Sequence, residues 1–239
     1  MLEAYGLSDI GKYREENQDR FLIDGALGLY AIADGMGGLP GGTAAASMAL
    51  EGLAARMVGF FVDGRDRGDA FVREFISETL HELNARVAKE TGGGGTTLVL
   101  LLTVGDRAFF ANAGDSSGFL YRDRRLMKMT RDHNVAGVLC EMGRLTQAEA
   151  RTHPSRNQLT SFLGTRAALE MSVRDAVLQK GDRLLLCSDG LTGMVGDDAI
   201  AGVLEAEQDP RAAVEMLIRM ANEAGGYDNV TAVLADVTG

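Results

Sequence analysis

The sequence predicts an α+β fold in which helices cover antiparallel sheets. Two observations support this class. Apolar, strand-like segments follow one another as meanders, and amphipathic helical segments come in two pairs. A parallel sheet would instead require single strands and single helices to alternate along the chain.

The first third of the chain predicts one strand followed by a pair of helices. Residues 29–33 are a short apolar run typical of a buried strand. Residues 44–61 and 69–88 both repeat apolar side chains at helical spacing. The apolar positions are Ala46, Ala49, Leu50, Leu53 and Met57 in the first helix, and Val72, Phe75, Ile76, Leu80, Leu83 and Val87 in the second.

The middle of the chain predicts an antiparallel meander. Residues 97–104 and 107–113 are joined by Gly105-Asp106, and glycine at the first position of a two-residue link favours a type II′ hairpin turn. Residues 118–122 and 126–129 continue the meander around a charged turn.

The regular pattern weakens over residues 131–166, which we expect to form a surface flap. Within this flap, Thr146 and Glu149 have the spacing of a capping box that opens a short helix.

The last quarter of the chain predicts a strand at residues 183–188, a helix at 197–206 and a closing strand at 229–237. Asp209-Pro210 supplies an N-cap and a first-turn proline for another helix between them.

Composition favours a single domain spanning residues 1–239 and excludes several functions. The chain is 46% hydrophobic with three prolines, and its formal net charge is −10. This charge leaves no surplus of basic residues for a nucleic acid, and no segment has the pattern of a signal peptide or membrane span. Cys140 and Cys187 match no metal or redox spacing. We expect a monomeric cytoplasmic protein with no nucleic-acid or membrane partner.

The candidate functional residues are aspartates at the ends of predicted strands: Asp19, Asp34, Asp115, Asp189 and Asp228. Asp34 precedes a glycine-rich turn at residues 35–38, and Asp189-Gly190 repeats this arrangement. A single Asp-Gly pair is common in turns and by itself indicates no function. Carboxylates that converge on one site, however, repel one another unless a cation neutralises them, and oxygen ligands without a His/Cys cluster suit Mg²⁺ or Mn²⁺ rather than zinc.

The motifs around these aspartates resemble, in order, those of the metal-dependent protein phosphatases, the protein phosphatase 2C family, bacterial type. They are Ser8-Asp9-x-Gly11 with Arg14-x-x-Asn17-x-Asp19, Asp34-Gly35-Met36-Gly37-Gly38, Gly95-Thr96-Thr97, Gly114-Asp115-Ser116, Thr130-x-Asp132-His133, Ser188-Asp189-Gly190 and Asp228-Asn229-Val230-Thr231. The resemblance implies a central antiparallel β-sandwich flanked by pairs of helices, with a metal centre at one end.

The resemblance also implies the metal ligands. Asp34 is expected to bridge two Mn²⁺ or Mg²⁺ ions, with Asp189 and Asp228 completing the first site. The Gly35 carbonyl is expected to serve the second ion, and Asp115 a third, weaker one.

Three further residues are expected to act around these ions. Asp19 would act through metal-held water, and Asn229 would orient Asp228 or its waters. Arg14 matches the arginine that grips the substrate phosphate, a role that suits a planar bidentate donor.

The implied activity is hydrolysis of phosphoserine and phosphothreonine on proteins by a metal-activated water, which reverses serine/threonine kinase signalling. Phosphorylated proteins, including an autophosphorylated kinase, are the expected partners. We also hypothesise that flap residues Arg144, Arg151 and Arg156 steer acidic phosphopeptides.

The chain departs from the family pattern at four positions. Gln18 stands where many relatives have glutamate, which puts the affinity of the second metal in doubt. Met36 replaces a histidine that is proposed as the general acid in animal relatives. Ser117 and Ser161 replace common arginines that are not metal ligands.

Two alternatives from other classes remain open in the sequence. Residues 114–118 fit the G-x-S-x-G elbow of serine hydrolases, with Asp132, His133 or His153 downstream, although an elbow should lead into a helix. A catalytically silent binding domain is the other alternative, but it would be expected to lose metal aspartates. We interpret His133 as a structural or capping residue.

Overall fold

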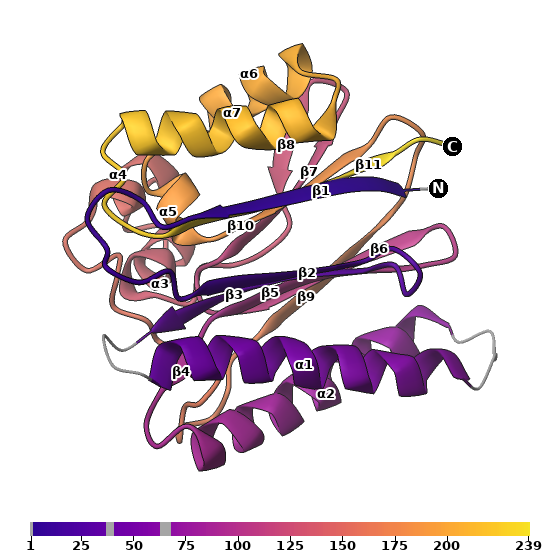
Figure 1. The fold of residues 1–239 in the computed structure, drawn as a ribbon, viewed down its shortest axis with the longest axis vertical. Coiled ribbons are helices and arrows are strands. Elements are labelled where there is room, and N and C mark those ends of the chain that lie inside the picture. Colours follow the sequence, from indigo (N-terminus) through magenta and orange to yellow (C-terminus); the bar gives the residue numbers. More distant parts are fainter. Residues whose placement is uncertain (1, 37–40, 63–67) are drawn as a thin grey trace.

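The computed structural model of the protein describes residues 2–36, 41–62 and 68–239. Two antiparallel sheets stack face to face, and helices cover their outer faces (Figure 1). The five-stranded sheet has the spatial order β1 (Leu2–Asp9), β11 (Val230–Val237), β10 (Arg183–Cys187), β7 (Ser117–Arg122) and β8 (Arg125–Lys128). The six-stranded sheet has the order β2 (Asp19–Asp24), β3 (Leu29–Met36), β5 (Leu98–Val104), β6 (Arg107–Ala113) and β9 (Ser172–Val177), with β4 (Gly95–Thr96) paired to β3.

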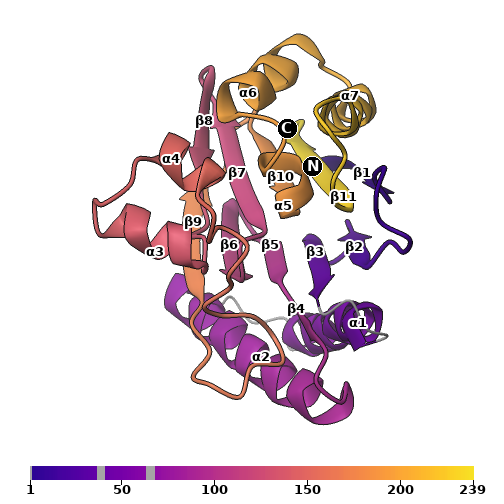
Figure 2. The ribbon, with the colours of Figure 1, turned by 90° about the vertical axis from the view of Figure 1, so that its left-hand side faces the viewer.

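The helices fall into three groups. The long helices α1 (Gly41–Val62) and α2 (Asp69–Glu90) cover the six-stranded sheet, and α6 (Asp197–Ala206) and α7 (Pro210–Glu223) cover the five-stranded sheet (Figure 1). The short helices α3 (Val135–Glu141), α4 (Gln147–Thr152) and α5 (Asp189–Thr192) gather at one end of the stacked sheets, as Figures 1 and 2 show. None of the described helices combines the length and apolarity needed to cross a membrane.

Three layers of buried side chains hold this arrangement together. One layer lies between the six-stranded sheet and α1 and α2, one between the five-stranded sheet and α6 and α7, and one between the sheets. Strand β3 shows how one segment serves two layers. Ala31 faces the first helix pair, whereas Tyr30 and Ile32 face the other sheet. Because both faces are buried there, residues 29–33 of β3 are continuously apolar rather than alternating.

The predicted α+β class is confirmed, and so are both pairs of long helices. The predicted continuous meander is wrong. Strands β5 and β6 form a hairpin in the six-stranded sheet, whereas β7 and β8 form a hairpin in the five-stranded sheet, because the chain crosses from one sheet to the other between β6 and β7. Gly105 has a φ of 60° and Asp106 does not share the positive φ, which fits the predicted type II′ turn between β5 and β6. The charged turn between β7 and β8 places Asp123 and Arg124 at φ values of 49° and 62°. The capping box at Thr146 and Glu149 is present at the start of α4.

The structure differs from the prediction at several boundaries. Strand β3 does not end at Ala33 but continues to Met36, because Gly35 and Met36 pair with β4. Asp189 opens a short helix rather than a turn. Strands β1 and β9 were not predicted at all, and the predicted flap contains the additional helix α3. Gly37 and Gly38 lie outside the described residues.

Candidate functional site

The aspartates singled out in the sequence lie at the same end of the sandwich. Asp19 opens β2 and is the cross-strand partner of Asp34 on β3. Asp189 follows β10, and Asp228 precedes β11, the strand paired with β10. The antiparallel pairing of β10 with β11 brings the end of one strand beside the start of the other. The sheet topology therefore gathers residues as far apart in sequence as Asp19 and Asp228.

Asp19 is held in a buried hydroxyl network. One carboxylate oxygen, Oδ2, accepts hydrogen bonds of 2.7 Å from both Ser188 and Thr231. The other oxygen, Oδ1, is buried with no hydrogen-bond partner among the described residues. Burial raises the pKa of Asp19, and the two hydroxyl donors partly offset this effect. The geometry fixes one oxygen and leaves the other free to face a ligand.

Asp34 and Asp189 lie at the centre of the acidic group. Burial raises the pKa of Asp34 well above its ordinary value, and the charges of Asp19 and Asp189 raise it further. Burial and the charges of Asp115 and Asp228 likewise raise the pKa of Asp189. Asp19 and Asp189 are the two carboxylates whose charges act most strongly on Asp34. Carboxylates this close together repel one another unless a proton or a cation compensates their charge.

Glycines at two close approaches make this convergence possible. A side chain at Gly190 would place its Cβ 1.9 Å from the carbonyl oxygen of Asn229, so only glycine lets α5 lie against the segment after Asp228. A Cβ at Gly35 would lie 2.5 Å from the carbonyl oxygen of Gly42 in the first turn of α1. The Asp-Gly pairs are thus explained by packing as well as by turn formation.

Arg14 is the cation that meets the acidic group at its surface. Its guanidinium donates to Oδ2 of Asp228 at 2.8 Å, while Oδ1 of Asp228 accepts from the backbone N–H of Asn229. Both side chains of the pair are partly exposed, at 53% for Arg14 and 35% for Asp228. A surface-facing guanidinium with one carboxylate partner among the described residues keeps donors available for an incoming anion.

The side chain of Asn229 contacts the loop that carries Arg14. Its side-chain amide donates to the backbone carbonyls of Ile10 and Glu16 and accepts from the backbone N–H of Gln18. Asn229 thus ties the loop that carries Arg14 to the strand that follows Asp228. Only its backbone N–H touches the Asp228 carboxylate.

Asp115 joins the site from the loop between β6 and β7. Burial raises its pKa to about 6, against the opposing effect of a 3.0 Å hydrogen bond from the side chain of Asn134. Asn134 also caps α3 by accepting from the backbone N–H of Gly137. Asp115 is therefore connected directly to the first helix of the predicted flap.

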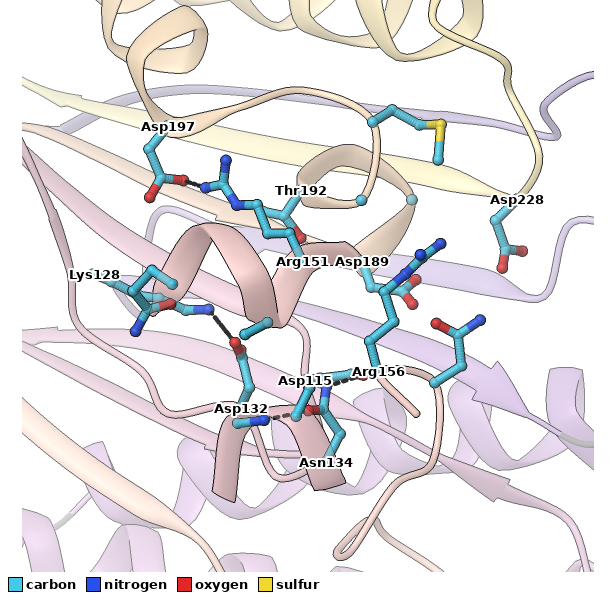
Figure 3. A pocket seen from close by; sticks show the side chains of 18 of the residues that line it. Asp115, Lys128, Asp132, Asn134, Arg151, Arg156, Asp189, Thr192, Asp197 and Asp228 are labelled. Carbon is cyan, nitrogen blue, oxygen red and sulfur yellow. Dashed lines mark hydrogen bonds and ion pairs between the residues drawn. The ribbon is translucent and has the colours of Figure 1, made fainter. Parts of the chain in front are cut away.

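A cavity of about 210 Å³ opens beside these residues. Arg14, Asp115, Asp189 and Asp228 line one side of it, and residues of α3 and α4 line the other. Figure 3 shows Asp115, Asp189, Asp228 and the flap residue Arg156 around the same space. The flap thus covers the acidic group without closing it.

The donor set fits hard divalent cations, although no cage is preformed. Within the described residues, no three His, Cys, Asp or Glu side chains are arranged so that they could already hold a metal ion. Asp228 contacts Arg14 instead. Buried oxygens without partners, Oδ1 of Asp19 and Oδ1 of Asp189, nevertheless remain at the centre. Oxygen donors whose negative charge is otherwise uncompensated are what Mg²⁺ and Mn²⁺ prefer.

The serine hydrolase alternative does not fit the structure. Ser116 is fully buried, its hydroxyl lies 2.7 Å from that of Thr97, and the chain continues into strand β7 rather than a helix. His133 accepts a hydrogen bond at Nδ1 from the backbone N–H of Gly114, in agreement with a structural role. Neither His133 nor His153 lines the cavity.

The three flap arginines and Ser161 differ in their contacts. Arg151 forms an ion pair with Asp197 of α6, so it holds the flap against the body of the protein (Figure 3). Arg151 and Arg156 both line the cavity, and Arg144 does not. Ser161 exchanges hydrogen bonds with the backbone of Glu170, so its position is structural.

Sequence reasoning missed the groups that hold the aspartates in place. They are Ser188, Thr231 and Asn134, all polar residues that contact a site aspartate. A signal was present for Ser188, which precedes Asp189 directly, and for Thr231, which lies three residues after Asp228. Their partner Asp19 is distant in sequence, and only the fold shows the contact.

Comparison with known proteins gives matches that extend over nearly the whole chain. Residues 12–237 match the family described as protein phosphatase 2C. The chain is 32% identical over 242 residues to protein phosphatase PhpP of Streptococcus pneumoniae, covering 99% of this chain and 98% of that protein.

Solved structures give the same result. Serine/threonine phosphatase Stp1 from Staphylococcus aureus matches with a TM-score of 0.89 and 30% identity, covering 100% of this chain and 96% of that one. The catalytic domain of serine threonine protein phosphatase PstP, solved in complex with two manganese ions, matches with a TM-score of 0.82 and 33% identity, covering 100% and 99%.

Proposed function

The chain belongs to the protein phosphatase 2C family, and from this premise we propose that it hydrolyses phosphoserine and phosphothreonine on proteins with the help of bound divalent metal ions. One observation carries the proposal. A group of buried and partly buried, mutually repelling carboxylates lies at one end of the sandwich, and three of them line an open cavity together with the exposed Arg14. This combination suits a metal centre next to an anion site.

Two Mn²⁺ or Mg²⁺ ions are the proposed cofactors. The manganese-containing PstP structure, with which this chain shares its fold and a third of its sequence, supports manganese. Asp34 would be a ligand to both ions, a role supported by the strong effect that the charges of Asp19 and Asp189 have on its pKa. Asp189 and Asp228 would complete the first site, and the carbonyl of Gly35 would serve the second. Asp115, at the rim of the cavity, would serve a third.

The bound ions would activate a water molecule for attack on phosphorus and offset the charge of the phosphoryl oxygens. The chain itself would position the reactants. Asp19, fixed by Ser188 and Thr231, would orient a water molecule with its free oxygen. Arg14 would release Asp228 to the metal and donate to the phosphate in its place, because a phosphate offers paired acceptors to a guanidinium. Arg14 already lines the cavity, whereas Asp19 is buried and is not among the residues that line it.

Protonation of the leaving oxygen requires a group other than a histidine at position 36. Methionine occupies that position, and no histidine lines the cavity in the described part of the chain. We propose that the proton comes from water in the site. A substrate alcohol that is already acidic, such as para-nitrophenol, should therefore leave more easily than serine.

The proposed substrates are phosphorylated proteins, including an autophosphorylated serine/threonine kinase. The cavity is open on one side, so a phosphorylated side chain presented by a protein surface could enter it. A role in reversing kinase signalling, a cytoplasmic location and a monomeric state complete the proposal and stay predictions.

Hydrolysis assays on metal-stripped protein test the proposal. Para-nitrophenyl phosphate and a phosphothreonine peptide are supplied before and after Mn²⁺ is restored, with and without a serine-reactive inhibitor. Activity that returns with Mn²⁺ and is insensitive to the inhibitor would support the proposal. Activity that is independent of metal, or no activity with any metal, would contradict it.

A further inference from the structure

Two exposed tyrosines form a stacked pair at the edge of the cavity. The rings of Tyr13 and Tyr227 have centroids 5.1 Å apart and an interplanar angle of 25°. They are also among the most exposed large apolar side chains of the described residues, at 67% for Tyr13 and 59% for Tyr227. A stack that served only to join two loops would bury most of both rings, whereas here at least half of each residue faces solvent.

The position of the pair relates it to the substrate. Tyr13 directly precedes Arg14, and Tyr227 directly precedes Asp228, so the stack runs beside the ion pair that these residues form. Tyr227 itself lines the cavity together with Arg14 and Asp228. The apolar surface is thus continuous with the site at which the phosphate would bind.

The backbone holds the pair firmly in this position. The N–H of Lys12 donates to the carbonyl of Gly226 at 2.7 Å, which joins the two loops beside the stack. Gly225 has a φ of 150°, and a Cβ there would lie 2.5 Å from the ring of Tyr227. Because the ring lies over the glycine backbone, its orientation is restricted before any substrate binds, which lowers the entropic cost of a contact.

We propose that Tyr13 and Tyr227 form a docking platform for an aromatic or large aliphatic side chain next to the phosphorylated residue of a protein substrate. The proposal rests on the proposed function, because Arg14 must hold the phosphate. Consecutive Cα atoms are about 3.8 Å apart in any chain. The Cα of a substrate residue adjacent to the phosphoresidue therefore lies as far from the Cα of that phosphoresidue as the Cα of Tyr13 lies from the Cα of Arg14.

An apolar occupant fits the platform better than a charged one. The rings offer flat apolar faces, and the basic side chains of Arg14 and Lys12 flank Tyr13 in the sequence. A lysine or arginine of the substrate would meet these positive charges, and an acidic residue would meet the carboxylates of the site. Aromatic packing of this kind increases affinity about 2- to 10-fold.

The test uses phosphothreonine peptides that differ only in the residue before or after the phosphothreonine, with phenylalanine, leucine, glycine or lysine there. The readout is the ratio of kcat/KM for the phenylalanine peptide to kcat/KM for the glycine peptide. This ratio cancels any loss of chemistry or of loop positioning, to which both peptides are equally sensitive. Para-nitrophenyl phosphate, which is too small to reach the platform, reports the proposed function separately.

We expect a ratio of about 2 to 10 in at least one peptide series for the unmodified protein. Tyr13→Ala and Tyr227→Ala should bring the ratio to about 1, and Tyr227→Phe should preserve it because the ring faces make the contact. Phe71→Ala, which removes an exposed aromatic from α2 outside the cavity, is the matched control and should leave the ratio unchanged.

Three outcomes would overturn the platform while the proposed function stands. Para-nitrophenyl phosphate would be hydrolysed with Mn²⁺, but the ratio would be 1 in both series, or it would be unchanged in both alanine variants, or the lysine peptide would be the better substrate. Failure to hydrolyse any substrate with Mn²⁺ would instead contradict the proposed function and the platform together.

Discussion

Strands β10 and β11 have acidic residues at both ends, but the interaction partners of these residues differ between the two ends. At the end beside the chain termini, Asp182 precedes β10 and Asp236 lies near the close of β11 (Figure 1). At the opposite end, Asp189 follows β10 and Asp228 precedes β11. The same two strands thus offer an internal comparison between carboxylates in similar positions.

At the end beside the termini, the protein supplies its own counter-charges. Arg122 donates to Asp182 at 2.6 Å through Nε, and Arg183 donates to both carboxylate oxygens of Asp236 at 2.8 Å. At the other end, the aspartates face one another, and Arg14 is the arginine that contacts one of them.

This difference in pairing distinguishes carboxylates that stabilise the fold from carboxylates that are available to bind a ligand. A buried carboxylate that is paired within the chain is compensated as soon as the protein folds. A group of carboxylates with too few cations is an energetic cost that folding alone does not remove. The charge of the acidic end is therefore compensated only when a cation binds from outside the chain.

The largest effect is expected for Asp34→Asn. Removing the carboxylate shared by both proposed ions should lower kcat/KM about a thousandfold or more. The metal-free variant should be at least as stable as the metal-free parent, because one of several repelling charges is gone. Steady-state assays with Mn²⁺ and thermal unfolding in EDTA measure the two effects. A variant that keeps near-normal turnover would remove Asp34 from the proposed site.

The same change at the other end should have the opposite consequence. Asp182→Asn leaves Arg122 without its carboxylate partner, and we expect a loss of about 2–3 kcal/mol in the free energy of unfolding. Turnover per folded molecule should be unchanged. Urea denaturation and assays below the transition measure this. The exposed turn residue Asp123 is the control, since Asp123→Asn should change stability by less than about 0.5 kcal/mol. If Asp182→Asn and Asp123→Asn lowered the free energy of unfolding equally, the structural role of Asp182 would be refuted.

Arg14→Ala should lower kcat/KM for a phosphothreonine peptide about 10- to 100-fold, the range expected for charge-assisted hydrogen bonds to phosphate. Arg14→Lys should recover part of this loss, because lysine keeps the charge but not the paired donors. An increase in KM measured at saturating Mn²⁺ would identify phosphate binding. If the alanine variant differed from the parent only in metal affinity, Arg14 would act on Asp228 rather than on substrate.

The smallest expected effect concerns pH. The pKa of Asp115 is raised to about 6, and those of Asp34 and Asp189 are raised well above their ordinary values. Because the folded protein then binds more protons than the unfolded chain, metal-free stability should fall as pH rises from about 4 through about 6 and beyond.

Thermal unfolding in EDTA and in Mn²⁺ at several pH values tests this expectation. The gain in Tm from Mn²⁺ should increase with pH, since the carboxylates must be deprotonated to bind a cation. Asp34→Asn should flatten the pH dependence in EDTA. A metal-free parent that becomes more stable between about pH 5 and about pH 7 would contradict the account.

Much of the fold was predictable because its signals are local. The apolar stripes of α1 and α2, the Gly105 turn and the capping box at Thr146 all depend on residues close together in sequence. Strand β1 was not predictable in this way, because its partner is the last strand of the chain, with Leu2 paired to Val237. A strand that depends on so distant a partner has little local pattern of its own.

In the candidate site, too, features with a local sequence signal were predictable and contacts between distant segments were not. The aspartates could be chosen from their motifs, and the fold brings them together. Contacts such as Ser188 to Asp19, or the side chain of Asn229 to the loop that carries Arg14, could not be derived, since each joins segments far apart in sequence. The stacked pair of Tyr13 and Tyr227 left no signal in the sequence for the same reason.

The central claim is that the acidic end of β10 and β11 is completed by metal ions. Calorimetric titration of Mn²⁺ into metal-stripped protein tests it most directly, with Asp34→Asn and Asp182→Asn titrated in parallel. We predict at least two bound ions per chain for the parent and for Asp182→Asn, and loss of this binding in Asp34→Asn. Absence of Mn²⁺ binding in the parent, or binding that Asp34→Asn leaves unchanged, would contradict the account.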